Sequence, residues 1–174
     1  TWLGVDFTQV RILNEVAPDV MAIRDRQFAA INQLVPNEPK NFPLSRIFNK
    51  SDVSIDLSLV NAKNAKIDAE KLTEDAKDER LDKSAIESVV KGYDFGDKKG
   101  LGIIFVAETL NKASLTGSYY VTIIDIGSKK VLLTERMTGK PAGFGFRNYW
   151  AKTIKEILLQ IERVKYREWK AANG

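Results

Sequence analysis

The chain has 174 residues, of which 44% are hydrophobic and 29% charged, and its formal net charge is +4. This length predicts one domain with a core of its own. The charge is too small for a protein that coats nucleic acid, and no apolar run approaches the roughly 18 residues that a membrane span requires.

The sequence contains neither cysteine nor histidine. This excludes disulfides, thiol nucleophiles, cysteine-bound metal centres and every site that depends on an imidazole. Carboxylates are nowhere clustered at metal-ligand spacing, so we expect no metal, no cofactor and no catalytic residue. Asp, Glu, Lys and Tyr can still support catalysis, but the balance favours a protein that is not an enzyme.

The N-terminal part predicts two elements. Residues 5–13 have the composition of a strand. Residues 19–34 predict a helix that begins after Pro18, a favourable residue near a helix start. Its apolar stripe consists of Val20, Ile23, Ala30, Ile31 and Leu34.

The segment DVSIDLSLV at 52–60 alternates polar and apolar residues, which predicts a half-exposed strand. On such a strand Asp52 and Asp56 would lie about 13 Å apart. A glycosidase-type acid pair requires about 5–9.5 Å, so we expect these carboxylates to belong to a solvated face.

Residues 61–82 hold 12 charged residues of both signs. This composition predicts an exposed, mobile excursion with some helical content rather than a linker between domains. A helix is expected at 82–91. Asp82 could cap it, or Ser84 and Glu87 could form a capping box, and Gly92 is a good terminator.

The C-terminal half contains the clearest strands. They are expected at 101–110, 119–126 and 131–137, the last two joined by a hairpin turn, and a helix follows at 147–170. Tyr119 and Tyr120 should point to opposite faces of one strand, so they cannot form a shared platform for RNA bases.

Together these elements predict a single domain over residues 1–174 of the α+β or α/β class. The expected order is β-α-β-α-β-β-β-α, with a mixed sheet of about five strands. The helices are expected to pack on one face of that sheet.

The segment GKPAGFGFRNYW at 139–150 allows two interpretations. Free amides at a helix start attract anions, and Lys140, Gly143, Gly145 and Arg147 could form such a ligand site. However, the spacing matches neither common phosphate-binding pattern. The favoured interpretation is a packing joint, in which the glycines adopt positive φ angles or close approaches and both phenylalanines close the end of the core.

The segment ERVKYREWK at 162–170 is basic and carries two aromatic residues. It could contact nucleic acid, but on a terminal helix this pattern is more often a solvated face with long side chains. We therefore expect no nucleic-acid partner.

The stretch YYVTIIDIGSKKVLLTERMTG, followed by a helix, resembles one region of a bacterial envelope α/β domain. Such domains occur in the amino-terminal part of Tol translocation proteins, in the curli-secretion lipoprotein and in lipoprotein activators of penicillin-binding proteins. Asp125, Gly127, Lys129 or Lys130, and Val131 match the hairpin of those families. The resemblance covers about residues 100–165, and the run GFGFRNYW is also similar to uncharacterised exported bacterial proteins.

The resemblance implies an exported, periplasmic or secreted domain that binds protein partners and brings no catalytic residues. The chain begins at Thr1, which is consistent with a removed signal peptide. The first functional hypothesis is therefore a non-catalytic binding or scaffolding domain of the envelope. The alternative is a small-ligand or phosphate-binding protein, conceivably an enzyme, that uses the 139–147 loop.

Overall fold

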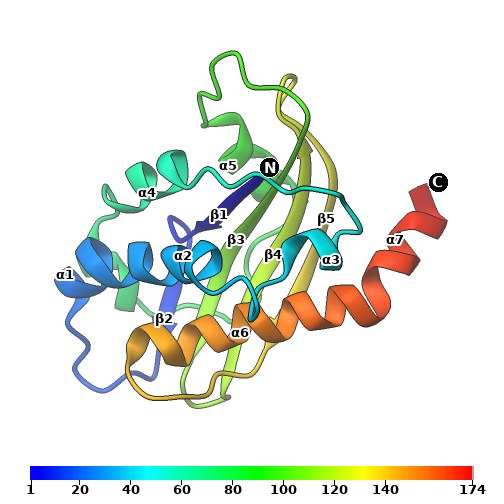
Figure 1. The fold of residues 1–174 in the computed structure, drawn as a ribbon. Helices are drawn as coiled ribbons and strands as arrows, with labels where there is room; N and C mark the ends of the chain where they lie inside the picture. The colour runs from blue at the N-terminus through cyan, green and yellow to red at the C-terminus, as the bar shows by residue number, and fades with distance from the viewer. Residues whose placement is uncertain (174) are drawn as a thin grey trace.

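A computed structural model describes residues 1–173, which form one mixed sheet of five strands with helices against it (Figure 1). Strands β1 (Trp2–Asp6) and β2 (Arg11–Leu13) both run parallel to β3 (Leu101–Asn111). Strands β4 (Thr116–Asp125) and β5 (Lys130–Gly139) complete the sheet in antiparallel order. The predicted α+β class is confirmed.

The expected strand at 5–13 is interrupted, and it starts earlier than predicted. The Asp6 carboxylate accepts hydrogen bonds from the amide and the hydroxyl of Thr8, at 2.7 and 2.5 Å. This local turn takes the chain out of the ladder after Asp6, and pairing resumes at Arg11. Strand β3 carries a bulge between Ala107 and Thr109, between the segments that pair with β1 and β2.

One face of the sheet packs against the longest helices. The first is continuous through α1 (Val20–Ala22), a π-helical turn η1 (Ile23–Gln27) and α2 (Phe28–Asn37). The last comprises α6 (Phe146–Gln160), a second π-helical turn η3 (Ile161–Lys165) and α7 (Tyr166–Asn173). A short helix, α3 (Leu44–Ile47), lies beside them. Both long predicted helices are confirmed, each three residues longer at its C-terminal end.

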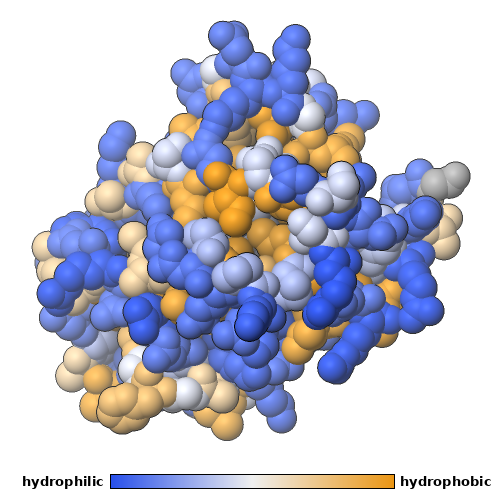
Figure 2. Space-filling model, in the orientation of Figure 1, coloured by the Kyte–Doolittle hydropathy of each residue, from blue (hydrophilic) through white to orange (hydrophobic). Residues whose placement is uncertain are grey.

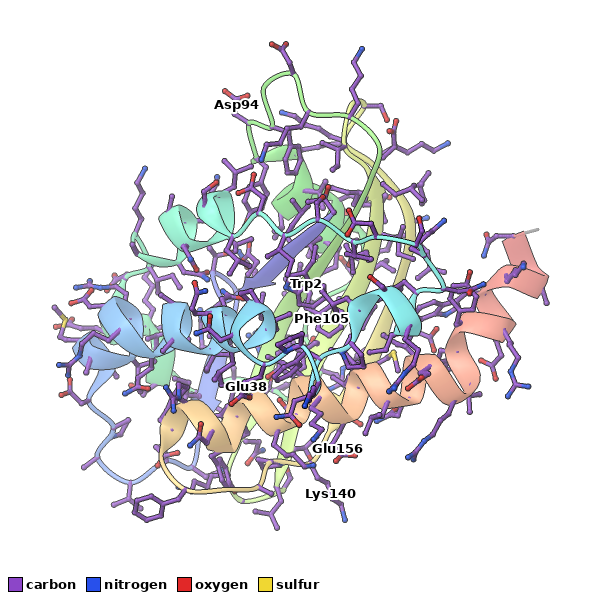
Figure 3. The ribbon with its side chains drawn as sticks, viewed as in Figure 1. Trp2, Glu38, Asp94, Phe105, Lys140 and Glu156 are labelled. Atoms are coloured by element: carbon purple, nitrogen blue, oxygen red, sulfur yellow. The ribbon has the colours of Figure 1, made fainter. Side chains whose placement is uncertain are left out.

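The main core lies between this face and the helices. Figure 3 shows Trp2 and Phe105 side by side at its centre, and their rings meet edge to face with centroids 5.0 Å apart. Helix α6 contributes Trp150, Ile154 and Ile157 from the predicted apolar seam, and all three are buried. Burial of this seam is what holds α6 against the sheet.

Helices cover both faces, which corrects the one-face expectation. Helix α5 (Lys83–Lys91) is capped by Asp82 as predicted, and the Asp82 carboxylate accepts from the amide of Ala85 at 2.8 Å. Its Val90 belongs to a second, smaller core with Leu3 and Ile104. Because side chains alternate along a strand, Leu3 and Ile104 face away from Trp2 and Phe105.

The prediction of a strand at 52–60 is wrong, because the structure has no regular strand over these residues. Ile55 forms only an isolated bridge with Trp2, and helix α4 (Ser58–Asn64) starts where the strand should continue. The Asp56 carboxylate accepts from the amide and hydroxyl of Ser58, at 3.1 and 2.6 Å, and this local turn immediately precedes the helix.

Asparagine side chains occupy the outer edge of β1, where the strand predicted at 52–60 would have paired. Asn32 accepts from the amide of Val5 at 2.7 Å, and Asn64 accepts from the amide of Phe7 at 2.8 Å. Both asparagines also donate to the carbonyl of Val5. A Cβ atom on Gly4 would lie only 2.8 Å from Val60, so the glycine allows α4 to approach closely.

The charged segment 61–82 contains the end of α4 and a 3₁₀ turn, η2 (Ala69–Thr73). Its Asn64, Ala69 and Leu72 are buried, so parts of it belong to the packed protein. Its mobility stays a prediction. Within residues 1–173 no helix combines the length and hydrophobicity needed to cross a bilayer.

Candidate functional site

The three glycines of the 139–147 segment serve two different purposes. A Cβ atom on Gly139 would lie 2.3 Å from the carbonyl oxygen of Thr153, so β5 and α6 can approach this closely only with glycine there. Gly143 and Gly145 instead have φ angles of +111° and +82°. A Cβ on Gly145 would have no neighbour within 4 Å, so its backbone conformation is what requires glycine.

The two phenylalanines between these glycines behave oppositely. Phe146 packs against the core, with its ring centroid 6.4 Å from that of Trp150, as the joint interpretation predicts. Phe144 is 94% exposed, so the expectation that both rings close the core is wrong for this residue. Gly143 and Gly145 flank Phe144 with left-handed backbone and thereby hold its ring away from the protein.

The structure does not gather the proposed anion-binding residues around one hollow. Lys140 lines a hollow of about 490 Å³ together with Glu156, and Figure 3 shows both on the outer side of α6. Gly143 and Gly145 line a different hollow of about 290 Å³. Arg147 lines neither, and its guanidinium contacts Asn148 at 3.2 Å.

The smaller hollow is lined by Trp150, whose buried indole nitrogen has no hydrogen-bond partner within residues 1–173. The indole nitrogen of Trp2, in the main core, is unpartnered in the same way. The first amides of α6 start beside the smaller hollow, where the helix dipole is positive. Glu15 also lines it, but its carboxylate is paired with Lys112 at 3.1 Å.

Phe144 is one of three exposed apolar side chains on connections at one end of the sheet, and we call these three together the loop end. Its other members are Val16, 90% exposed, and Leu115, 53% exposed. They lie on the connections that leave β2, β3 and β5 at one end of the sheet (Figure 1). Figure 2 shows apolar surface at this end of the molecule, which is the lower end in the view.

Contacts around Lys112 hold these three connections together. The Lys112 amide donates to the carbonyl of Leu13 at 3.0 Å, and its ammonium pairs with Glu15. The same ammonium lies 5.1 Å from the ring centroid of Tyr149 on α6. Lys112 therefore ties the connection after β2, the β3–β4 hairpin and the start of α6 to one another.

Leu115 is an unusual choice at its position. Its φ angle of +53° is in the left-handed region, which costs an L-residue about 1–2 kcal/mol and which Asn and Gly tolerate better. Its exposed side chain recovers little of this cost through burial within the chain. The sequence therefore maintains an apolar group where both conformation and hydration favour a polar residue or glycine.

A second region, on the face of the sheet that carries α5, buries polar groups instead. We call it the Glu108 cluster, because Glu108 is fully buried at the bulge of β3. Its carboxylate pairs with Nε of Arg136 at 2.7 Å and accepts from the amides of Arg80 and Leu81 at 3.0 and 2.8 Å. Glu108 thus fixes the end of the charged segment onto the sheet.

Other bonds complete this cluster. The Arg80 guanidinium donates to the carbonyls of Gln9 and Glu108 and to the Thr109 hydroxyl. Burial, followed by the nearby charge of Arg11, lowers the pKa of Arg80 below its usual value. The Tyr120 hydroxyl donates to the carbonyl of Leu81 at 2.6 Å. Because its polar groups bond to one another and to the backbone of the chain, we infer that the Glu108 cluster stabilises the fold.

The sequence identified some of these features and missed others. Tyr119 and Tyr120 do face opposite ways: the hydroxyl of Tyr119 is 2.7 Å from that of Thr153 on α6, whereas Tyr120 reaches the Glu108 cluster. Sequence reasoning did not find the Glu108 cluster, although a lone Glu in an apolar strand is a signal for a buried charge. Residues 1–173 contain no group of three acidic side chains placed to hold a metal.

Comparison of the chain with protein-family models, with curated proteins and with solved structures finds no match. The resemblance to envelope domains and the expectation of export therefore stay predictions. The case for a function depends on the geometry of the chain itself.

Proposed function

We propose that this protein is a non-catalytic binding domain of the bacterial envelope that contacts a protein partner through the loop end. The observation that carries the proposal is Phe144, which is 94% exposed and held outward by two positive-φ glycines. An aromatic side chain presented in this way gains free energy only when a partner covers it. Location in the envelope is supported by sequence resemblance, that of the β4–β5 hairpin and that of the run GFGFRNYW.

The chemistry of the loop end indicates the kind of partner. Its three apolar side chains come from separate connections, and Lys112 links the first two of these to the start of α6. The exposed cations Lys140 and Arg147 lie on the same loop and helix start as Phe144. A partner with an apolar pocket for Phe144 and an acidic rim would complement this surface.

A photo-crosslinking amino acid placed at position 144 tests the proposal in cells. The control is the same substitution at Val164, which is 50% exposed on η3 and lies outside the loop end. We expect a discrete protein adduct at position 144 that is absent at position 164. With the partner purified, Phe144→Ser should weaken binding by roughly tenfold or more, while Val164→Ser should leave it unchanged.

Two outcomes would contradict this function. Equal crosslinking at 144 and 164 would show that the loop end is not a docking surface. Partition onto lipid vesicles that depends on Phe144, without a protein adduct, would replace the protein partner by a membrane surface.

A small ligand at the 290 Å³ hollow is the second candidate, supported by the unpartnered indole nitrogen of Trp150. Under this alternative, inorganic phosphate should bind, and Lys112→Gln, which removes the cation that lines this hollow, should weaken binding. The separation of Lys140 from this hollow makes it the weaker of the two hypotheses.

A further inference from the structure

A hollow of about 440 Å³ lies beside the β1–β2 interruption, where Thr8 and Arg11 line it, and is not part of either candidate function above. Four of the residues that line it are cationic, namely Arg11, Lys63, Lys66 and Lys71, and one, Asp68, is acidic. Its volume is within the range of about 300–1,000 Å³ typical of small-ligand sites.

The four cations come from three separate elements. Arg11 begins β2, Lys63 is on α4 with Lys66 just after it, and Lys71 is in η2. Cations near the C-terminal end of a helix are favoured by its dipole, which explains Lys63 and Lys66. The helix dipole does not explain why Arg11 and Lys71 lie at the same hollow.

The positive charge of this hollow is only weakly compensated. Within residues 1–173, Lys66 and Lys71 have no carboxylate within 4.0 Å, and Arg11 has only Glu74, at 3.9 Å. Lys63 donates to the carbonyl of Gly92 at 2.7 Å, and its ammonium lies 5.2 Å from the ring centroid of Tyr93, so neutral groups rather than a carboxylate hold it. The Asp68 carboxylate is engaged with the amide of Glu70 at 3.3 Å, as the cap of η2.

A partly buried neighbour, Arg80, adds to this field. Arg80 is close enough to Arg11 for the charge of Arg11 to help lower the pKa of Arg80. Its guanidinium donates to carbonyl and hydroxyl oxygens rather than to a carboxylate. Glu108 and Asp78 offset part of the repulsion between Arg80 and Arg11, and an anion bound beside Arg11 would offset more of it.

We propose that this hollow is a binding site for a small molecule that carries two or more adjacent phosphate groups. Lys66, Lys71 and Arg11 would neutralise the phosphates, because ammonium and guanidinium groups are the usual partners of phosphate oxygens. Ile67 and Leu72, both buried, supply apolar surface in the wall for the uncharged remainder of the ligand.

Titration with inorganic pyrophosphate, followed by calorimetry and by amide NMR shifts, tests the site. We expect saturable binding at one site, stronger than for orthophosphate, with shifts concentrated at residues 8–11 and 63–72. The double variant Lys66→Gln with Lys71→Gln should weaken binding by roughly tenfold or more, because it removes two charge-assisted contacts.

The matched control is Lys50→Gln with Lys99→Gln, which removes the same charge from two exposed lysines that do not line the hollow. Binding within about twofold of the unmodified protein is expected for it. Comparable melting temperatures for both double variants would show that each is folded.

Three results would overturn the proposal. One is the absence of saturable pyrophosphate binding, and another is an equal loss in both double variants, which would mean unspecific attraction. The third is a Lys66- and Lys71-dependent affinity for phosphatidylglycerol vesicles without pyrophosphate binding, which would assign the hollow to lipid headgroups.

Discussion

The Glu108 cluster and the loop end place side chains in opposite environments. The first buries the Glu108 carboxylate beside two partly buried guanidinium groups, and the second exposes Phe144, Val16 and Leu115 to solvent. Both arrangements cost free energy, but only the cluster recovers that cost within the chain, through its hydrogen bonds. The loop end has no such compensation among residues 1–173, and this difference is the reason to assign stability to one region and binding to the other.

The largest expected effect is at Glu108. Glu108→Ala would leave the Arg136 guanidinium and the amides of Arg80 and Leu81 without their acceptor, so we expect a loss of about 3–5 kcal/mol in the free energy of unfolding. Denaturant unfolding measures it. The matched control is Glu79→Ala, since Glu79 pairs with the same Arg136 at 3.2 Å but is 77% exposed.

The control should cost less than about 1 kcal/mol. If both variants lose the same free energy of unfolding, burial does not make the Glu108 pair more stabilising than the exposed Glu79 pair. The assignment of stability to the Glu108 cluster would then be wrong.

Gly145→Ala is the next test. Its φ of +82° and ψ of 152° belong to a region that is essentially restricted to glycine, while the added methyl group would meet no atom within 4 Å. Backbone strain alone should therefore reduce the free energy of unfolding by about 1–3 kcal/mol. Thermal unfolding checks this value, and an unchanged stability would show that Phe144 is not held outward by backbone geometry.

Leu115→Asn should shift stability and binding in opposite directions. Asparagine tolerates the left-handed backbone at this position, so we expect a gain of about 0.5 kcal/mol in the free energy of unfolding. Affinity for the partner captured at position 144 should fall, because an apolar contact is removed. A variant that loses both stability and affinity would indicate that Leu115 serves the fold.

A pH-dependent effect is expected at Glu135, a partly exposed ion-pair site between the two extremes. Burial alone would raise the pKa of Glu135, but hydrogen bonds from Lys165 and Trp169 outweigh it and lower the pKa below its usual 4.5. Because the pKa of Glu135 is lower in the folded than in the unfolded protein, its ionised form stabilises the fold above pH 4.5. This contribution is lost as the pH falls through the pKa of Glu135 in the folded state. Trp169 and Lys165 belong to the C-terminal helix, so this contribution tethers that helix to β5.

Glu135→Gln should therefore be less stable than the unmodified protein at pH 7 and approach it below pH 4.5. Unfolding curves between pH 3 and 7 measure the difference, and Glu168→Gln is the control, since Glu168 also contacts Lys165 but is 56% exposed. A constant difference at all pH values would refute the role of ionisation at Glu135.

The sequence by itself determined the elements whose signals are local. Helical periodicity located the helices at 19–34 and 147–170, Asp82 marked the start of α5, and the β4–β5 hairpin followed from its turn residues. These features depend on contacts between residues close in the chain, which a sequence pattern records directly. The α+β class followed from their order.

Tertiary structure decided the features that depend on distant partners. The alternation at 52–60 is that of a strand, but Asn32 and Asn64 occupy the β1 edge, and a turn between Asp56 and Ser58 leads into a helix. In the same way, Phe144 and Phe146 are equally hydrophobic in the sequence, and only the backbone at Gly143 and Gly145 places one outside and the other inside. Which charges meet at Glu108 or at the basic hollow depends on packing between residues far apart in the chain, and no local pattern contains that information.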